Sequence, residues 1–269
     1  MDENRRQDIL YEVRDAVAVI TANRPQAMNA LDVPLAKALQ GAVEAAERDP
    51  AVRAVAILGA GQHFMAGGDI RTFVASLDQP EVERTRLFSE LIGAAHSAIS
   101  SIHRMPKPVV AGVQGAVAGF GYSLMNACDL AVAADNAYLS LAYSRLGATP
   151  DGGSSYTLPR LVGRKRAAEI AMLSDRIDAA RALELGLVNR IVPAPELAAE
   201  TVTLAIRLAN GATGALGKTK ALLNQSFARS LDEQLLAELQ SFVSASQSDD
   251  FREGVNAFVG KRSPRFSGK

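Results

Sequence analysis

Three glycine-rich turns and one aspartate are the residues of this sequence whose types and spacing could do chemistry. The turns lie at 59–68, 112–121 and 146–155, and the third contains Asp151. The first two turns follow β-type apolar runs and lead into helical patterns, so each would present unpaired backbone N–H groups at close range. Two such turns could bind one oxygen together, and the third adds a carboxylate. The glycines of the second turn equally fit tight packing of a strand against a helix.

Familiar glycine motifs do not fit the second turn. Residues 119–124 have the first two glycines of a dinucleotide-binding fingerprint but lack the third, and no Walker lysine follows. Residues 121–125 lack the closing glycine of a nucleophile elbow, which makes Ser123 a poor nucleophile candidate. Neither a nucleotide-binding loop nor a serine nucleophile is therefore indicated.

Composition and charge set the outer limits. The chain has 269 residues, of which 48% are hydrophobic and 22% charged, as is ordinary for a soluble globular protein. Its formal net charge of zero gives no bulk electrostatic reason to expect nucleic acid or an anionic membrane as a partner. The single cysteine, Cys128, excludes an internal disulfide.

No targeting, membrane or metal signal is found. The first ten residues are polar, and no stretch reaches the length of a membrane span, so we expect a cytoplasmic protein. His63, His96 and His103 show no metal-ligand spacing. We expect surface or packing roles for these histidines and no metal site.

The elements that must position the turns alternate between strands and helices. The sequence predicts a hairpin at 9–21 that turns at Arg14-Asp15, and a helix that Asp32 caps and Asp49-Pro50 ends. The further predictions are a strand at 52–58, a helix from about Asp69, a helix at 80–104, strand–turn–helix over 108–130, strands at 129–133 and 138–141, and mostly helix from Leu158 apart from a strand at 187–192.

These pieces resemble the crotonase, or enoyl-CoA hydratase/isomerase, superfamily over nearly the whole chain. Seven segments occur in the order of that family, and together they are far more specific than any one of them. They are Asn23-Arg24-Pro25 with Asn29-Ala30-Leu31, then 64–70, 115–129, Pro150-Asp151-Gly152-Gly153, 158–163, 182–188 and 258–268.

The resemblance implies a fold, an assembly and a substrate class. It implies an α/β fold in which ββα units form a spiral core over residues 1–195, followed by a helical oligomerisation region over 196–269. It also implies a homotrimer or a dimer of trimers, and an acyl-coenzyme A thioester as substrate, with no permanently bound cofactor. Coenzyme A enters as part of that substrate.

The resemblance also implies residue roles. The backbone N–H groups that hold the thioester oxygen carry over to Gly68 and Phe120. Ala66, Gly67, Asp69 and Ile70 match the segment along the adenine and pantetheine, and Lys261 lies in a basic tail that can reach a coenzyme A phosphate across a subunit boundary. Asp69 is equally well explained as a helix N-cap, and Lys261 as part of a solvated chain end.

The chemistry depends on three positions. Family hydratases use two glutamates, but the matching positions here hold Ser123 and Tyr143. Asp151 falls where another subset, similar to the ring isomerase of phenylacetyl-CoA breakdown and to Δ3,Δ2-enoyl-CoA isomerases, keeps its acid/base. The sequence Pro-Asp-Gly-Gly is also a good β-turn. Tyr143 could orient a group or pack, and Ser123 could be a polar residue near the acyl end or pack between helices.

The leading hypothesis is an acyl-CoA isomerase that shifts a double bond, or opens an epoxide-type ring, through a thioester enolate with Asp151 as base. A hydratase that uses Asp151 to activate water is the nearest rival. Dehalogenation by an aspartate nucleophile fits less well, because the known examples have tryptophan in the pocket and this chain has none. From another class, the protein could be a coenzyme A-binding or RNA-binding relative with little turnover.

Overall fold

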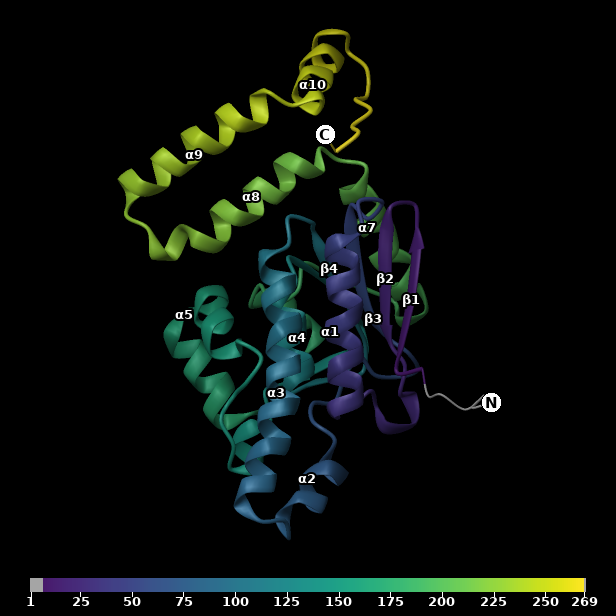
Figure 1. Ribbon diagram of the computed structural model, residues 1–269, viewed down its shortest axis with the longest axis vertical. Coiled ribbons are helices and arrows are strands. Elements are labelled where there is room, and N and C mark those ends of the chain that lie inside the picture. The colour runs from purple at the N-terminus through teal and green to yellow at the C-terminus, as the bar shows by residue number, and fades with distance from the viewer. Residues whose placement is uncertain (1–6, 269) are drawn as a thin grey trace.

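A six-stranded sheet runs through the centre of the computed structural model, which describes residues 7–268 (Figure 1). Residues 1–6 of the polar N-terminal stretch considered above lie outside the described residues. The first two strands are antiparallel and the others are parallel. In spatial order the strands are β1 (Ile9–Arg14), β2 (Val17–Ala22), β3 (Ala54–Gly59), β4 (Val109–Val113), β6 (Leu130–Ala134) and β9 (Arg190–Val192).

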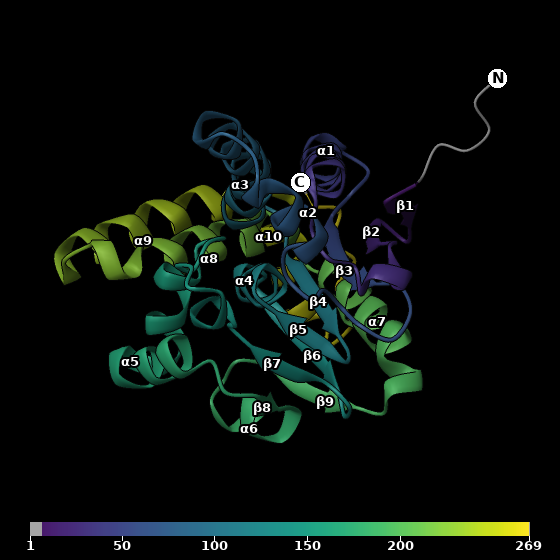
Figure 2. The same ribbon diagram turned by 90° about the horizontal axis from the view of Figure 1, so that it is seen from below.

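Helices cover both faces of this sheet (Figure 2). In β3, Ala54 and Ala56 pack in the cluster that includes α7 (Leu197–Ala209). Val55 and Ile57 point to the opposite cluster, which includes α1 (Val33–Arg48) and α3 (Glu81–Arg104). A strand buried on both faces needs apolar residues at every position, which is why the strand predicted at 52–58 shows no alternation.

A second, smaller sheet pairs β5 (Ala116–Ala118), β7 (Tyr138–Ser140) and β8 (Ile177–Asp178). Consecutive strands therefore enter different sheets: β4 joins the large sheet, β5 the small one, and α4 (Phe120–Ala127) follows. The next pair, β6 and β7, repeats this path. The fold class predicted from the resemblance is confirmed. The prediction for 108–130 missed β5, because three residues between glycines are too short to show a period.

Most predicted helix starts and turns lie close to the observed ones. The Asp32 carboxylate accepts a hydrogen bond from Leu35 N at 3.0 Å and caps α1 as predicted. Asp69 caps α2 (Ile70–Leu77) in the same way. The hairpin turn, however, lies at Asp15 and Ala16, with φ of 48° and 59°, one residue later than predicted. Two successive positive φ values match the twist of the paired strands, which outweighs the unfavourable side chains.

The remaining helices form the C-terminal third. A break at Gly163 (φ 74°) divides α5 (Ser154–Leu173), which begins before the predicted Leu158. After α6 (Ala179–Glu184) and α7, the helices α8 (Thr213–Gln225), α9 (Leu231–Ser246) and α10 (Asp249–Val259) extend away from the sheets (Figures 1 and 2). Lys220 ties α8 to the core by donating to the carbonyl of Ile102 at 2.6 Å and to Asp129 at 2.8 Å.

The division of the chain near residue 195 stays a prediction. The helix directly after that point, α7, packs on the large sheet, whereas α9 has no buried residue. Between residues 7 and 268, no helix combines the length and apolar character that a membrane crossing requires.

Candidate active site

The first two glycine turns meet at Gly67 and Gly119, which have φ of 91° and 50°. A Cβ placed on Gly119 would lie 3.2 Å from Cα of Gly67, and one placed on Gly67 would lie 3.3 Å from the carbonyl oxygen of Ala118. An isolated parallel bridge between Met65 and Val117 joins the segments just before the turns. Both the left-handed backbone and the close approach therefore require glycine at these two positions.

Each of these glycines is followed by an unpaired backbone donor. Within residues 7–268, neither Gly68 N nor Phe120 N has a hydrogen-bond acceptor. Phe120 is the first residue of α4, where the helix geometry leaves the N–H groups without partners. The ring of Phe73 covers Gly68 so closely that a Cβ there would lie 2.3 Å from its Cζ. Two N–H donors are thus free beside one apolar wall.

The third glycine turn lies on the start of α4. A Cβ on Gly152 would come within 2.6 Å of the Ser123 side chain and within 3.0 Å of the Phe120 ring. This packing places Asp151, the preceding residue, beside the helix that begins at Phe120. The carboxylate of Asp151 accepts a hydrogen bond from the hydroxyl of Tyr143. Asp151 and Phe120, selected separately from the sequence, are therefore neighbours.

Three more side chains hold the backbone around Asp151. The buried Ser123 donates from Oγ to the carbonyl oxygen of Asp151 at 2.9 Å. The Ser154 hydroxyl donates to the same oxygen at 3.1 Å. His96, on α3, accepts from Gly152 N through Nε2 at 3.1 Å. Pro-Asp-Gly-Gly does form a turn, as the sequence allows, but side chains from two other helices fix that turn.

Burial and hydrogen bonding act on Asp151 in opposite directions. Burial raises the pKa of the Asp151 carboxyl above its usual range, and the hydrogen bond from Tyr143 partly offsets this. Burial, and then the charge of Asp151, raise the pKa of the Tyr143 phenol. Tyr143 therefore stays protonated at neutral pH and donates, while Asp151 can exchange a proton more readily than an exposed aspartate.

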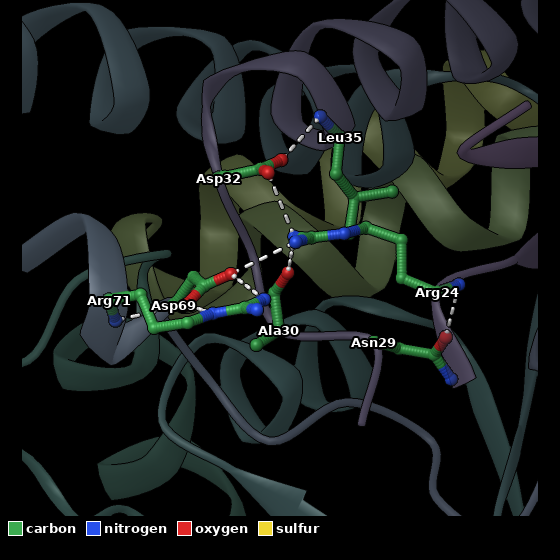
Figure 3. Close-up of polar contacts among 7 residues, drawn as sticks. All are labelled: Arg24, Asn29, Ala30, Asp32, Leu35, Asp69 and Arg71. Atoms are coloured by element: carbon green, nitrogen blue, oxygen red, sulfur yellow. Dashed lines mark hydrogen bonds and ion pairs between the residues drawn. The ribbon is translucent and has the colours of Figure 1, made fainter. Parts of the chain in front are cut away.

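Asp69 has a structural environment instead (Figure 3). Its carboxylate caps α2 by accepting from Arg71 N at 3.0 Å and pairs with the guanidinium groups of Arg24 at 2.9 Å and Arg71 at 3.0 Å. The hydrogen bond from Arg71 is the main cause that lowers the pKa of Asp69 to about 2. Arg24 also pairs with Asp32 at 3.0 Å, so it joins the caps of α1 and α2.

Asn29 explains the spacing of the first family segment. Its amide nitrogen donates to the carbonyls of Ala60 at 3.0 Å and His63 at 2.8 Å, in the first glycine turn. Its amide oxygen accepts from Arg24 N at 2.7 Å. The segment that contains Arg24 and Asn29 thus supports the turn that ends at Gly68.

The other residues implied by the resemblance lie in two places. Ala66 donates from its backbone N to Met28 O at 3.1 Å, and Ile70 is exposed at the start of α2. Lys261 follows α10, at the opposite end of the long axis from α2 (Figure 1). Within one chain, Lys261 is therefore not brought together with Ala66, Gly67, Asp69 and Ile70.

Sequence reasoning missed the contact of His96 with the Asp151 turn, since a surface or packing role was expected for it. For Tyr143, orienting a group in the pocket was one of the two expectations, and its hydroxyl donates to Asp151. For Ser123 and Tyr143 the only signal in the sequence was their position, because they stand where family hydratases have their two glutamates. Across residues 7–268, no cluster of three His, Cys, Asp or Glu side chains could hold a metal ion.

Comparison with known proteins shows the family of this chain. A family model described as enoyl-CoA hydratase/isomerase matches residues 12–269. The trans-2-decenoyl-[acyl-carrier-protein] isomerase of Streptococcus mutans is 32% identical, covering 98% of this chain and 99% of the relative. The 1,2-epoxyphenylacetyl-CoA isomerase of Escherichia coli is 35% identical, covering 97% and 98%.

A solved structure extends the comparison to three dimensions. The crystal structure of an enoyl-CoA hydratase from Polaromonas sp. JS666 aligns with a TM-score of 0.89 at 38% identity, covering 96% of this chain and 99% of that one. Sequence family and fold thus agree along almost the full chain. The protein belongs to the enoyl-CoA hydratase/isomerase (crotonase) family and is an enzyme of the hydratase or isomerase type.

Proposed function

We propose that this enzyme is an acyl-thioester isomerase that shifts a double bond, or opens an epoxide-type ring, with Asp151 as its only acid/base. One observation carries the proposal: Ser123 and Tyr143, at the positions where family hydratases use glutamates, both donate hydrogen bonds to Asp151. A single carboxylate suffices for isomerisation, because the proton removed from one carbon can be returned by the same group to another.

The double-bond shift has two proton transfers. The Asp151 carboxylate takes a proton from the α carbon of a 3-enoyl thioester, and the electron pair of the broken C–H bond delocalises as a dienolate. Its negative charge rests on the thioester oxygen between Gly68 N and Phe120 N, the two donors without protein partners. The Asp151 carboxyl then returns the proton to the γ carbon, which leaves the 2-enoyl thioester. The raised pKa makes the Asp151 carboxylate a stronger base for the first transfer.

The carrier in this proposal is coenzyme A, bound as part of the substrate, and the enzyme needs no permanent cofactor. The backbone at Ala66, Gly67, Asp69 and Ile70 would lie along the adenine and pantetheine. The exposed side chain of Ile70 and the firmly capped start of α2 support this assignment. Lys261 would serve a neighbouring copy of the chain, because it follows α10, which lies at the opposite end of the long axis from α2, the helix that Ile70 begins (Figure 1).

Assembly as a homotrimer or a dimer of trimers belongs to the same proposal, as does a cytoplasmic location. The apolar side chains of α9 support assembly, because they are exposed in the single chain. The predicted division into a core (1–195) and an oligomerisation region (196–269) agrees with α9 in particular, which has no buried residue.

Isomerisation of a 3-enoyl-CoA tests the proposal. We expect the native enzyme to form the 2-enoyl isomer, measured by ultraviolet absorbance, and to incorporate deuterium from heavy water, measured by mass spectrometry. Asp151→Asn should lose ~100-fold or more of kcat, the size expected for a missing acid/base group. The variant should still bind the thioester. Equal turnover by the two proteins would overturn the proposal.

Hydration is the second candidate, because a relative of known structure at 38% identity is an enoyl-CoA hydratase. In that case Asp151 would activate water, and the 2-enoyl-CoA absorbance would be lost as the 3-hydroxy product forms. If native protein and Asp151→Asn bind thioesters equally and neither converts them, the protein is a binding relative and Asp151 a turn residue.

A further inference from the structure

Tyr143 is the one side chain that the structure shows bonded to the carboxylate of Asp151. It opens a short 3-10 helix, η2 (Tyr143–Leu146), where its N donates to Leu141 O at 2.8 Å and its carbonyl accepts from Ala148 N at 3.1 Å. These main-chain bonds fix the base of the side chain. The turn therefore holds the backbone from which the phenol extends.

The phenol lies between the two halves of the candidate site. Its Cζ is 3.9 Å from the Cβ position of Gly119, the residue before the Phe120 donor. Its hydroxyl donates to Oδ1 of Asp151. In the described part of the chain, Oδ2 has no hydrogen-bond partner. One carboxylate oxygen is thus occupied and the other is free.

We propose that Tyr143 is a positioning residue: its hydroxyl anchors Oδ1 of Asp151, so that Oδ2 alone carries the proton between the two substrate carbons. This inference rests on the proposed function of Asp151 as the single acid/base. Without the anchor the carboxylate could rotate about its Cβ–Cγ bond and exchange its oxygens, which would lengthen the path of the proton. A tyrosine also suits the position chemically, because it donates to the carboxylate without competing with it as a base.

The same hydrogen bond has an electrostatic effect. It stabilises the ionised carboxylate and so acts against burial, which favours the neutral carboxyl. The titratable groups that face Asp151 are Tyr143 from η2 and His96 from α3, whose Nε2 accepts from Gly152 N. Removing the Tyr143 hydroxyl leaves burial unopposed by this bond. The pKa of Asp151 should therefore rise further.

Tyr143→Phe is the test variant, and Tyr138→Phe is its matched control. Tyr138 lies on β7 with the guanidinium of Arg176 4.5 Å from its ring centroid, a contact that phenylalanine preserves. We expect Tyr143→Phe to lower kcat by about tenfold or more with little change in KM, because the lost bond orients the base rather than the substrate. The acid limb of kcat/KM should move up by about one pH unit. Tyr138→Phe should behave as the native enzyme does.

A titration that does not depend on turnover separates the two proposals. With 13C-labelled aspartate, the Asp151 carboxyl signal is assigned by its absence in Asp151→Asn and followed against pH. A higher pKa in Tyr143→Phe than in the native protein supports the inference, whether or not the substrate is turned over. An unchanged pKa together with an unchanged acid limb overturns it. If Asp151→Asn keeps full activity, the proposed function fails, whatever the titration shows.

Discussion

Asp69 and Asp151 are carboxylates of one chain held in opposite electrostatic environments. Two guanidinium groups and a backbone N–H surround Asp69 and lower its pKa to about 2. Asp151 is partly buried, accepts from a phenol, and has a raised pKa. The second environment moves the pKa of a carboxyl toward neutral pH, whereas the first moves it away. Asp69 therefore has a structural environment, whereas the environment of Asp151 suits the acid/base role proposed above.

The lowered pKa of Asp69 also means that its ionised carboxylate stabilises the folded protein. Because the folded-state pKa of about 2 lies below the unfolded value near 3.8, the contribution is complete above about pH 4 and is lost as pH falls toward 2. The side chain is 8% exposed, and the shift corresponds to about 2 kcal/mol of unfolding free energy. We expect Asp69→Asn to lower stability by about that amount at pH 7.

Urea unfolding of the native protein and of Asp69→Asn measures this loss of stability. The difference between their unfolding free energies at pH 3 should be about half of the difference at pH 7. Asp175→Asn is the control, because Asp175 is exposed, and its effect should stay within about 0.5 kcal/mol. A difference for Asp69→Asn that stays constant between pH 7 and pH 3 would contradict the pKa assignment.

At the scale of residues, the sequence could predict the groups that sit in distinctive local patterns. Glycine turns and the Asp151 loop are visible in the sequence because their spacing is local, as is the Asp32 cap. The contacts of Tyr143, Ser123 and His96 with the Asp151 turn were not predictable, since they join segments brought together only by the ββα path.

At the scale of elements, α4 depends on the contact of Gly121 with the first glycine turn. A Cβ on Gly121 would lie 2.3 Å from the carbonyl oxygen of Met65, which precedes Gly67 and Gly68. The helix start, and with it the Phe120 donor, can reach its place only because this residue has no side chain. The position of α4 is thus set by backbone contact.

Two helical glycines allow a matched prediction. Gly121→Ala should lower the unfolding free energy by about 1–3 kcal/mol through overpacking, and should lower kcat because the Phe120 donor shifts. Gly41→Ala on α1, where a Cβ meets nothing within 4 Å, should raise stability by about 0.5–1 kcal/mol. Denaturant unfolding and the isomerase assay measure both. Equal effects of the two changes would show that the Met65 contact does not hold α4.

The elements were more predictable where they are long. The amphipathic helices α1 and α3 follow from their periodic apolar residues and flanking prolines. The short strands β5 and β8, with three and two residues, have no sequence pattern of their own. They are strands because the neighbouring segment β7 pairs with both. These two strands therefore form because of tertiary contacts and not because of their own sequences.

At the scale of the whole molecule, α9 presents a row of apolar side chains to solvent. The exposed residues are Leu231, Leu235, Leu236, Leu239, Phe242 and Val243. Because α9 has no buried residue, the contacts within its own described chain leave this apolar row in solvent. This arrangement supports the trimer or hexamer proposed above. The sequence predicted helices here but could not reveal that the apolar side chains of α9 would stay exposed within residues 7–268.

Light scattering after gel filtration tests the assembly. We expect a mass of about three or six times the 28.4 kDa of one chain. The double variant Leu235→Glu with Phe242→Glu should reduce it toward a single chain, because it places two charges within the apolar row. Leu10→Glu on the edge strand β1, also at an exposed apolar residue, should leave the mass unchanged. A native mass of one chain would refute the proposed assembly.

The contact between Gly67 and Gly119, with Asp151 beside it, also has a kinetic consequence. The three residues come from segments far apart in the chain, which follow β3, β5 and β7. Contacts of this long-range kind close late in folding, because the loops between them must be ordered first. A nascent or truncated chain that ends before the third glycine turn can form the first two turns but lacks the carboxylate. The ability to convert substrate should therefore be among the last properties the chain acquires as it folds.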